Sequence, residues 1–202
     1  MELILASQSP RRRELLGLIA AGFSVCPADI DETMDESLTM EARVADLSAR
    51  KARAVAAEHA GAAVVGSDTV VVLDGVPLGK PADAADAKRM LSALSGRTHA
   101  VVTGVALALP DGRVLQDATV TRVRFAPLAE AEIDWYIASR EPMDKAGVRG
   151  RHTRYEWEDK AGGYAIQGMA ARFIEGIEGD YYSVMGLPVR RLYEMLKENG
   201  II

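Results

Sequence analysis

Short apolar runs alternate with segments of helical periodicity in the first half of the chain. Apolar runs typical of buried strands lie at residues 3–6, 23–27 and 62–73. Helix-start signals lie between them: Ser9 can cap a helix whose first residue is proline, and Thr39 can begin an Ala-rich helix that extends for about five turns. Strand and helix therefore alternate, which is typical of an α/β domain.

The second half predicts two strands around a turn, with helices on either side. The strands are expected at residues 100–109 and 114–125, separated by an Asp-Gly turn. Helices are expected at residues 83–94, 128–138 and 188–197. A hairpin beside alternating strands and helices indicates a mixed central sheet flanked by helices, not a fully parallel one. Because no Pro/Ser-rich linker divides the 202 residues, we expect a single domain over residues 1–202.

Composition narrows the classes of function. Apolar residues make up 49% of the chain and charged residues 26%, an ordinary globular balance. The net charge of -5 argues against broad binding to polynucleotides, but it leaves room for a small anionic substrate held by a few Lys and Arg residues. Cys26 is the single cysteine, and no apolar run reaches the ~20 residues of a membrane helix. We therefore expect a cytoplasmic protein with neither a membrane nor a polynucleotide as partner.

The start of the first predicted helix is a candidate anion site. Residues 7–13 read Ser-Gln-Ser-Pro-Arg-Arg-Arg, and this helix end already carries partial positive charge. A bound anion, held by backbone N–H groups and guanidinium forks, would make three arginines favourable here. Arg11 and Arg12 precede Leu15 and Leu16 by four residues, so they lean towards the inward face. A solvated basic helix start is the alternative.

A carboxylate and an ammonium are predicted in apolar surroundings. Asp68 interrupts the Val-rich strand, and an unpaired buried carboxylate is costly, so it should have a cation, a metal or a catalytic use. Lys51 shares a helical stripe with Val44, Leu47 and Val55. The alternatives are that Asp68 caps a turn between two short strands and that Lys51 extends outward to water.

The loop after the second predicted strand is acidic. It holds Asp29, Asp31 and Glu32, and oxygen-rich clusters of this kind suit Mg²⁺, which shares substrate phosphates. An acidic surface loop is the alternative. Further along, residues 75–81 have neither the glycine spacing nor the hydroxyl residue of a P-loop, although Lys80 could still present its charge to phosphate.

Several segments, taken together and in this order, resemble the Maf family. They are Leu5-Ala6-Ser7-Gln8-Ser9-Pro10-Arg11-Arg12, Asp31-Glu32, Lys51-Ala52, Ser67-Asp68-Thr69-Val70-Val71, Gly79-Lys80-Pro81, Leu94-Ser95-Gly96 with His99, Glu141-Pro142-Met143-Asp144-Lys145-Ala146-Gly147, Gly163-Tyr164-Ala165-Ile166-Gln167-Gly168 and Gly186-Leu187-Pro188. The resemblance covers nearly the whole chain. It implies a mixed α/β fold related to inosine triphosphatases (Maf/Ham1), usually as a homodimer. It also implies hydrolysis of nucleoside triphosphates to the monophosphate and pyrophosphate.

The resemblance also implies roles for particular residues. Asp68 matches the proton acceptor of the family, and Ser7 lies in its first matching segment. Arg11, Thr69 and Gln167 match the positions associated with the branch that prefers dTTP and UTP, whereas a sister branch prefers 7-methyl-GTP. A septum or cell-division regulator that acts by binding another protein is the alternative outside enzymes, and modified pyrimidine nucleotides are alternative substrates.

A mechanism follows from these roles and from physical needs. Mg²⁺ or Mn²⁺, held by substrate phosphates and by Glu32 and Asp68, is expected to polarise the α-phosphoryl group. Arg12, Lys51 and Lys80 are expected to offset the charge that shifts to the leaving pyrophosphate. The amide of a glutamine suits the imide edge of uracil or thymine, because it has both a donor and an acceptor.

One departure from the family pattern is a short repeat. Asp-Lys-Ala-Gly occurs at residues 144–147 and again at 159–162, whereas the family runs from one copy directly into the segment that holds Gln167. Residues 148–158 are therefore expected to be an insertion, either inert or covering the substrate or a dimer partner. Lys160 is favoured over Lys145 for the family position, because its link to Gln167 is uninterrupted.

Overall fold

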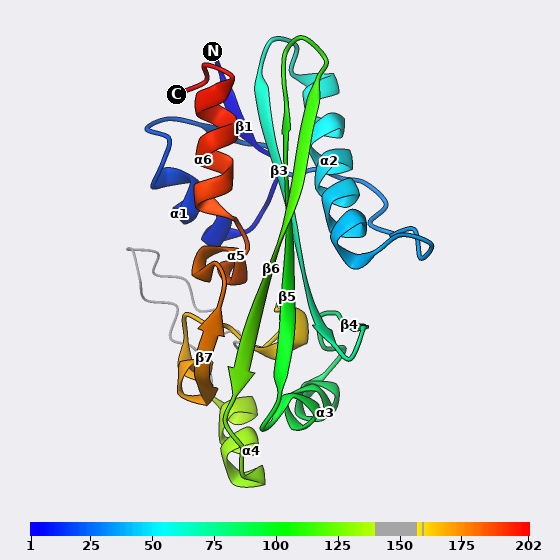
Figure 1. Ribbon diagram of the computed structural model, residues 1–202, viewed down its shortest axis with the longest axis vertical. Helices are drawn as coiled ribbons and strands as arrows, with labels where there is room; N and C mark the ends of the chain where they lie inside the picture. Colours follow the sequence, from blue (N-terminus) through cyan, green and yellow to red (C-terminus); the bar gives the residue numbers. More distant parts are fainter. Residues whose placement is uncertain (140–156, 159) are drawn as a thin grey trace. The chain divides into compact units, whose positions relative to one another are not determined.

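The computed structural model describes residues 1–139, 157–158 and 160–202 (Figure 1). Lys145 and most of the predicted insertion, residues 148–156, lie outside the described residues. The elements are β1 (Leu3–Leu5), α1 (Pro10–Gly17), β2 (Ser24–Val25), α2 (Met40–Glu58), β3 (Ala63–Leu73), β4 (Val76–Leu78), α3 (Ala84–Leu94), β5 (Thr98–Ala108), β6 (Val114–Phe125), α4 (Glu130–Ala138), η1 (Ala161–Gly163), η2 (Met169–Phe173), β7 (Ile174–Glu178), α5 (Tyr181–Met185) and α6 (Val189–Glu198).

The strands form one mixed sheet in the order β2-β1-β3-β5-β6-β7, with β4 paired to β3. β1 is parallel to both β2 and β3. β3 and β4 are antiparallel, and so are β6 and β7. The prediction of a mixed sheet flanked by helices is confirmed. A tight turn joins β3 to β4, whereas the segment between β6 and β7 contains α4, η1 and η2.

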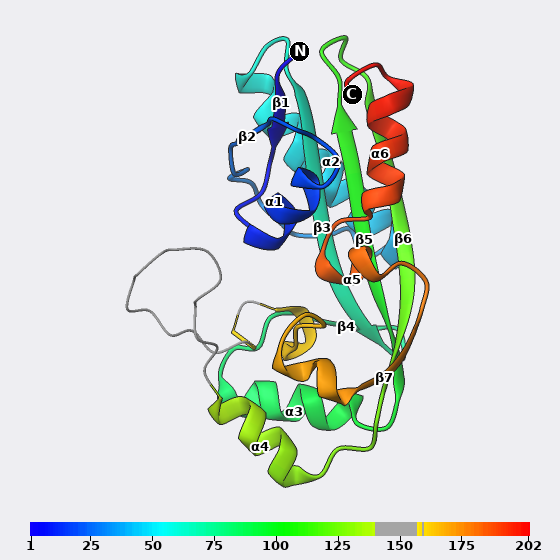
Figure 2. The ribbon, with the colours of Figure 1, turned by 90° about the vertical axis from the view of Figure 1, so that its left-hand side faces the viewer.

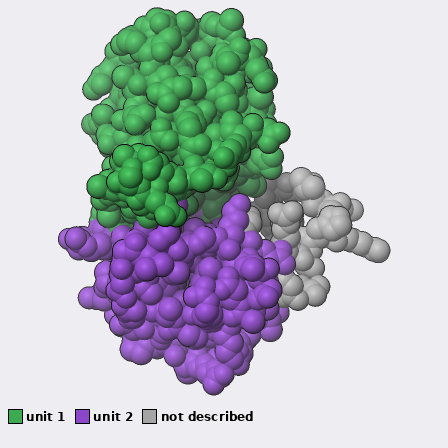
Figure 3. Space-filling model, turned by 90° about the vertical axis from the view of Figure 1, so that its right-hand side faces the viewer, with its two compact units in different colours: residues 1–69, 101–121, 179–202 green, residues 70–100, 122–178 purple. Residues whose placement is uncertain are grey.

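Two compact units divide the residues (Figure 3). Unit 1 comprises Met1–Thr69, Val101–Thr121 and Gly179–Ile202, and unit 2 comprises Val70–Ala100 and Arg122–Glu178. In unit 1, α1 and α6 cover one face of the sheet and α2 covers the other (Figures 1 and 2). Each face has its own apolar core. Leu5, Leu16 and Leu192 lie in the first, and Ile4, Ala52 and Val64 lie in the second.

The predicted helix starts are confirmed by their caps. Ser9 caps α1 through its side chain, with proline at the first helical position, and Thr39 caps α2 in the same way. Each cap satisfies an N–H group that the helix leaves without a partner. The sequence patterns missed β7 and α5, which are five residues long each and therefore too short for a periodic signal. No helix in the described part of the chain is long and apolar enough to cross a membrane.

Unit 2 is built around aromatic side chains. Phe125 contacts Tyr164 and His99 edge-on, at centroid distances of 4.9 and 5.1 Å, and Tyr136 contacts Phe173 at 5.4 Å. Helices α3 and α4 pack against each other in this unit (Figure 2). Edge-to-face pairs of this kind stabilise a core beyond their buried area.

His99 lies in this aromatic cluster with one ring nitrogen unpaired. Its Nε2 lies 2.6 Å from the hydroxyl of Tyr164, whereas Nδ1 is buried and, within the described residues, has no hydrogen-bond partner. Burial lowers the pKa of His99 from 6.5 to about 4 and raises the pKa of the Tyr164 phenol. The pair is therefore neutral at pH 7.

Acidification is expected to destabilise the protein through His99. The unfolded chain takes up a proton near pH 6.5 and the folded chain near pH 4, so the free energy of unfolding falls as the pH drops between these values. From pH 8 to pH 5 the loss through this group is about 2 kcal/mol. Thermal unfolding of the wild type, His99→Gln and His59→Gln at both pH values measures it. The loss should shrink in His99→Gln and persist in His59→Gln; an equal loss in all three proteins would contradict the assignment.

Candidate active site

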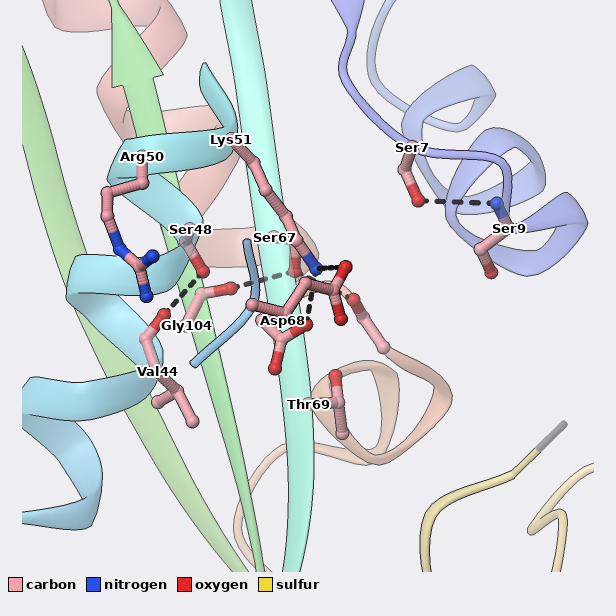
Figure 4. A network of polar contacts seen from close by, with 12 residues as sticks. Ser7, Ser9, Val44, Ser48, Arg50, Lys51, Ser67, Asp68, Thr69 and Gly104 are labelled. Atoms are coloured by element: carbon pink, nitrogen blue, oxygen red, sulfur yellow. Dashed lines mark hydrogen bonds and ion pairs between the residues drawn. The ribbon is translucent and has the colours of Figure 1, made fainter. Parts of the chain in front are cut away.

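Two glycines let α2 lie very close to the sheet in unit 1. A Cβ at Gly66 on β3 would lie 2.1 Å from the carbonyl oxygen of Ser48, and a Cβ at Gly104 on β5 would lie 2.2 Å from that of Val44. Neither position has room for a side chain. The Ser48 hydroxyl donates to the Val44 carbonyl at 2.6 Å, within the same turn of α2 (Figure 4). The close approach places the side chains of α2 within reach of residues on β3.

Lys51 uses this closeness to join two carboxylates. Its buried Nζ lies 2.7 Å from Oδ1 of Asp68 on β3 and 2.8 Å from Oε1 of Glu32 (Figure 4). The alternative of a lysine extending to water is therefore wrong. The alternative of Asp68 as a turn cap is also wrong, because β3 runs without interruption through this residue. The Asp68 side chain is 14% exposed and that of Glu32 is 62% exposed, so water reaches this group of three charges at Glu32.

Arg12 on α1 is held in a fixed direction by three acceptors. Its Nε donates to the carbonyl of Gly186 at 2.8 Å, and its two terminal nitrogens donate to Ser7 Oγ and Thr69 Oγ1, each at 3.3 Å. Gly186 ends α5 with φ of 117°, in the left-handed region that favours glycine. The prediction that Arg12 leans inward is confirmed.

Charges of both signs influence one another in this unit. Burial lowers the pKa of Arg12 from its ordinary value, while the charges of Asp68 and Glu32 act in the opposite direction. The guanidinium remains charged, because the ordinary pKa of arginine lies far above neutral pH. Arg12 and Lys51 therefore supply two cations, and Asp68 and Glu32 two anions, from four separate segments of unit 1.

Hydroxyl groups form a further network that the sequence analysis missed. Thr103 Oγ1 lies 2.7 Å from the Ser183 carbonyl and 3.1 Å from Thr69 Oγ1. The buried Ser67 hydroxyl lies 2.7 Å from one carbonyl on β5 and 2.9 Å from that of Gly186, which also accepts from Arg12. The network therefore holds Thr69 in place, together with the Gly186 carbonyl that accepts from Arg12. A polar residue in the middle of an apolar strand, such as Thr103, is the signal that could have identified it.

The acidic loop separates into residues with different roles. The carboxylate of Asp31 accepts from the backbone N–H of Thr33 at 2.9 Å and from its hydroxyl at 2.7 Å, which lowers the pKa of Asp31. Asp29 is exposed. Of the three predicted carboxylates, Glu32 is the one that pairs with Lys51.

The arrangement fits a divalent cation shared with a substrate. Glu32 and Asp68 bond the same nitrogen, so both carboxylates lie at one place in unit 1. Within the described residues, no group of three or more His, Cys, Asp or Glu side chains is placed to hold a metal. Mg²⁺ is commonly held by one or two carboxylates together with substrate phosphates, so two carboxylates suffice.

Three predicted site residues lie in unit 2. Lys80 and Gln167 are exposed and Lys160 is half-buried. The N–H of Gly162 donates to the carbonyl of Gly79 at 3.0 Å, so the segment of Lys160 runs beside that of Lys80. Arg11 and Thr69, which were predicted together with Gln167 to set the base preference, lie in unit 1 and are half-buried.

Comparison with known proteins decides the family. The family model described as "Maf-like protein" matches residues 2–153 and 149–199. The chain belongs to the Maf family. The two matched pieces of this Maf chain overlap between the two Asp-Lys-Ala-Gly copies.

Curated relatives of this Maf chain carry a common description. A "dTTP/UTP pyrophosphatase" of Symbiobacterium thermophilum is 48% identical over 200 residues, which are 98% of this chain and 94% of the relative. A protein of the same description from Shewanella sp. is 47% identical over 209 residues and covers 100% of both chains.

Solved structures agree on the fold of the Maf chain. The Ham1 protein of Staphylococcus aureus matches with a TM-score of 0.53 at 14% identity, over 98% of this chain and 100% of that one. A HAM1 protein from Coxiella burnetii matches with the same TM-score at 19% identity, over 98% and 99%. The predicted Maf/Ham1 fold is confirmed by these likenesses.

Proposed function

We propose that this chain hydrolyses dTTP and UTP to the nucleoside monophosphate and pyrophosphate, with a divalent cation such as Mg²⁺ or Mn²⁺. One observation carries the proposal: the buried ammonium of Lys51 bonds both Asp68 and Glu32, and the charges of these two carboxylates also act on Arg12. The descriptions of the relatives supply the substrate class. We also propose that residues 1–202 act as one catalytic domain.

The reaction needs a proton acceptor and cations around phosphate. Water attacks the α-phosphorus, its proton passes to the carboxylate of Asp68, and the bond from phosphorus to the bridging oxygen breaks. Arg12, Lys51 and Lys80 stabilise the negative charge that moves onto the leaving pyrophosphate. Glu32 and Asp68 would hold the divalent cation, which would supply electrophilic stabilisation of the phosphate oxygens.

Base preference is assigned to three residues. Arg11, Thr69 and Gln167 are proposed to select the pyrimidine, with the Gln167 amide offering both a donor and an acceptor to the imide edge. Ser7 contributes through its contact with Arg12, and Lys160 is proposed for the family lysine position. We further propose that the enzyme acts as a cytoplasmic homodimer.

A panel of nucleotides tests the proposal. Pyrophosphate release is measured with the four ribonucleotides, the four deoxyribonucleotides, 5-methyl-UTP, pseudo-UTP and 7-methyl-GTP, with Mg²⁺ or Mn²⁺ and with a chelator. We expect release from dTTP, UTP and their modified forms that stops when the chelator is added. Activity confined to 7-methyl-GTP would contradict the roles of Arg11, Thr69 and Gln167. No metal-dependent release from any nucleotide would refute the enzymatic function and favour a role in protein binding.

A further inference from the structure

Glu32 lies in a long loop between β2 and α2, and its position needs an explanation. Residues 26–39 contain neither helix nor strand, and the Glu32 side chain is 62% exposed. Loops without regular structure keep a side chain in one place only when other groups hold their backbone. The ion pair with Lys51 holds the carboxylate, whereas the backbone beside residue 32 needs contacts of its own.

Arg50 supplies that contact from α2. Its Nη1 donates to the carbonyl of Asp31 at 2.7 Å and its Nη2 donates to the carbonyl of Thr33 at 2.7 Å. These carbonyls belong to the residues immediately before and after Glu32. The third nitrogen, Nε, donates to Asp46 at 2.9 Å, one helical turn earlier. All three nitrogens of the guanidinium are therefore engaged, which fixes the plane of the fork.

The same segment is also closed on itself. The Asp31 carboxylate accepts both the backbone N–H and the hydroxyl of Thr33, so two local hydrogen bonds close the turn around Glu32. Arg50 and Lys51 leave α2 in different directions (Figure 4). One therefore holds the backbone around Glu32, while the other holds its carboxylate.

We infer that Arg50 is a positioning residue, which sets the Glu32 carboxylate beside Lys51 and Asp68 by clamping the two peptide carbonyls that flank it. The inference rests on the proposed role of Glu32 in the reaction. Lysine cannot replace arginine here, because a single ammonium lacks the planar fork that meets two separate carbonyls at once. Arg50 itself contacts no reacting group.

Arg43 offers a matched control on the same helix and the same loop. Its Nε donates to the carbonyl of Leu38 at 2.8 Å, and its Nη2 donates to that of Glu36. It therefore clamps the loop to α2 in the same manner, but four or more residues away from Glu32. Arg43→Lys reports what a general loosening of the loop does.

The experiment compares Arg50→Lys, Arg43→Lys, Glu32→Gln and the double variant Arg50→Lys/Glu32→Gln. Pyrophosphate release from dTTP gives kcat/KM for each, and the paramagnetic resonance of Mn²⁺ gives its dissociation constant in the nucleotide-free protein. We expect Arg50→Lys to lower kcat/KM by roughly 10- to 100-fold, because a small displacement of a reacting group has effects of that size. Mn²⁺ binding should weaken in parallel, whereas Arg43→Lys stays within about twofold of the wild type on both measures. The double variant should be no worse than Glu32→Gln, since Arg50 acts through Glu32.

Three outcomes would overturn the inference. Equal effects of Arg50→Lys and Arg43→Lys would show a general loosening of the loop. A double variant that loses the full factor of both single changes would show that Arg50 acts independently of Glu32. Full activity in Glu32→Gln would refute the role of Glu32 and with it this inference, whereas an inactive Glu32→Gln beside an unaffected Arg50→Lys would refute this inference alone.

Discussion

Asparagine in place of Asp68 is expected to lower the rate of pyrophosphate release about 10³-fold, the size of effect typical of a lost general base. Asparagine has nearly the same shape but neither takes a proton nor balances the charge of Lys51, which lies 2.7 Å from the carboxylate. The Lys51 ammonium keeps its second partner, Glu32, on the exposed side, so we expect the fold to survive. Pyrophosphate release from dTTP with saturating Mg²⁺ measures the rate, and thermal unfolding checks the fold.

Asp35→Asn is the matched control for this change. Asp35 lies in the same unit, is exposed, and accepts from the N–H and the hydroxyl of Ser37 at 2.9 and 2.7 Å. The control removes a carboxylate from the loop without affecting Lys51, so its rate should match the wild type. A folded Asp68→Asn protein with more than about a tenth of the wild-type rate would exclude Asp68 as the proton acceptor.

Alanine at Gly66 is expected to destabilise the protein by about 3 kcal/mol, near the upper end of the usual cost of overpacking a core. Its Cβ would lie 2.1 Å from the Ser48 carbonyl oxygen and 2.9 Å from the Ala52 N–H nitrogen. Both are backbone atoms of α2, so relief requires the helix to move away from β3. For a chain of this size the melting temperature should fall by roughly 6 to 12 °C. Activity should fall as well, because the same movement draws Lys51 away from Asp68.

Gly17→Ala is the control for the glycine substitution. A Cβ at Gly17, the last residue of α1, has no atom within 4 Å, and its backbone does not require positive φ. We expect its melting temperature to stay within a few degrees of the wild type, in line with the modest cost or gain of Gly→Ala at a compatible site. An unchanged melting temperature in Gly66→Ala would show that α2 is not held as closely to the sheet as described.

The elements were largely predictable from the sequence because their signals are local. Hydrophobic spacing and helix caps depend on residues a few positions apart, so α1, α2, α3 and the long strands β3, β5 and β6 were located correctly. Asp68 was singled out for a similar reason: a carboxylate within an apolar strand is costly unless it has a partner. The family was identified from the order of its motifs, without knowledge of any contact.

The tertiary structure alone decided which partners these residues have. No spacing rule connects Lys51 with Glu32, which lies in a loop, and the choice of Glu32 over Asp29 and Asp31 follows from where the loop is held. The clamp of Arg50 on the carbonyls around Glu32 and the bond from Arg12 to the Gly186 carbonyl join residues far apart in the chain to backbone atoms. Every residue type has a backbone carbonyl, so the sequence does not indicate which carbonyls will accept a hydrogen bond from a side chain. Only the folded backbone brings the donor and the acceptor together.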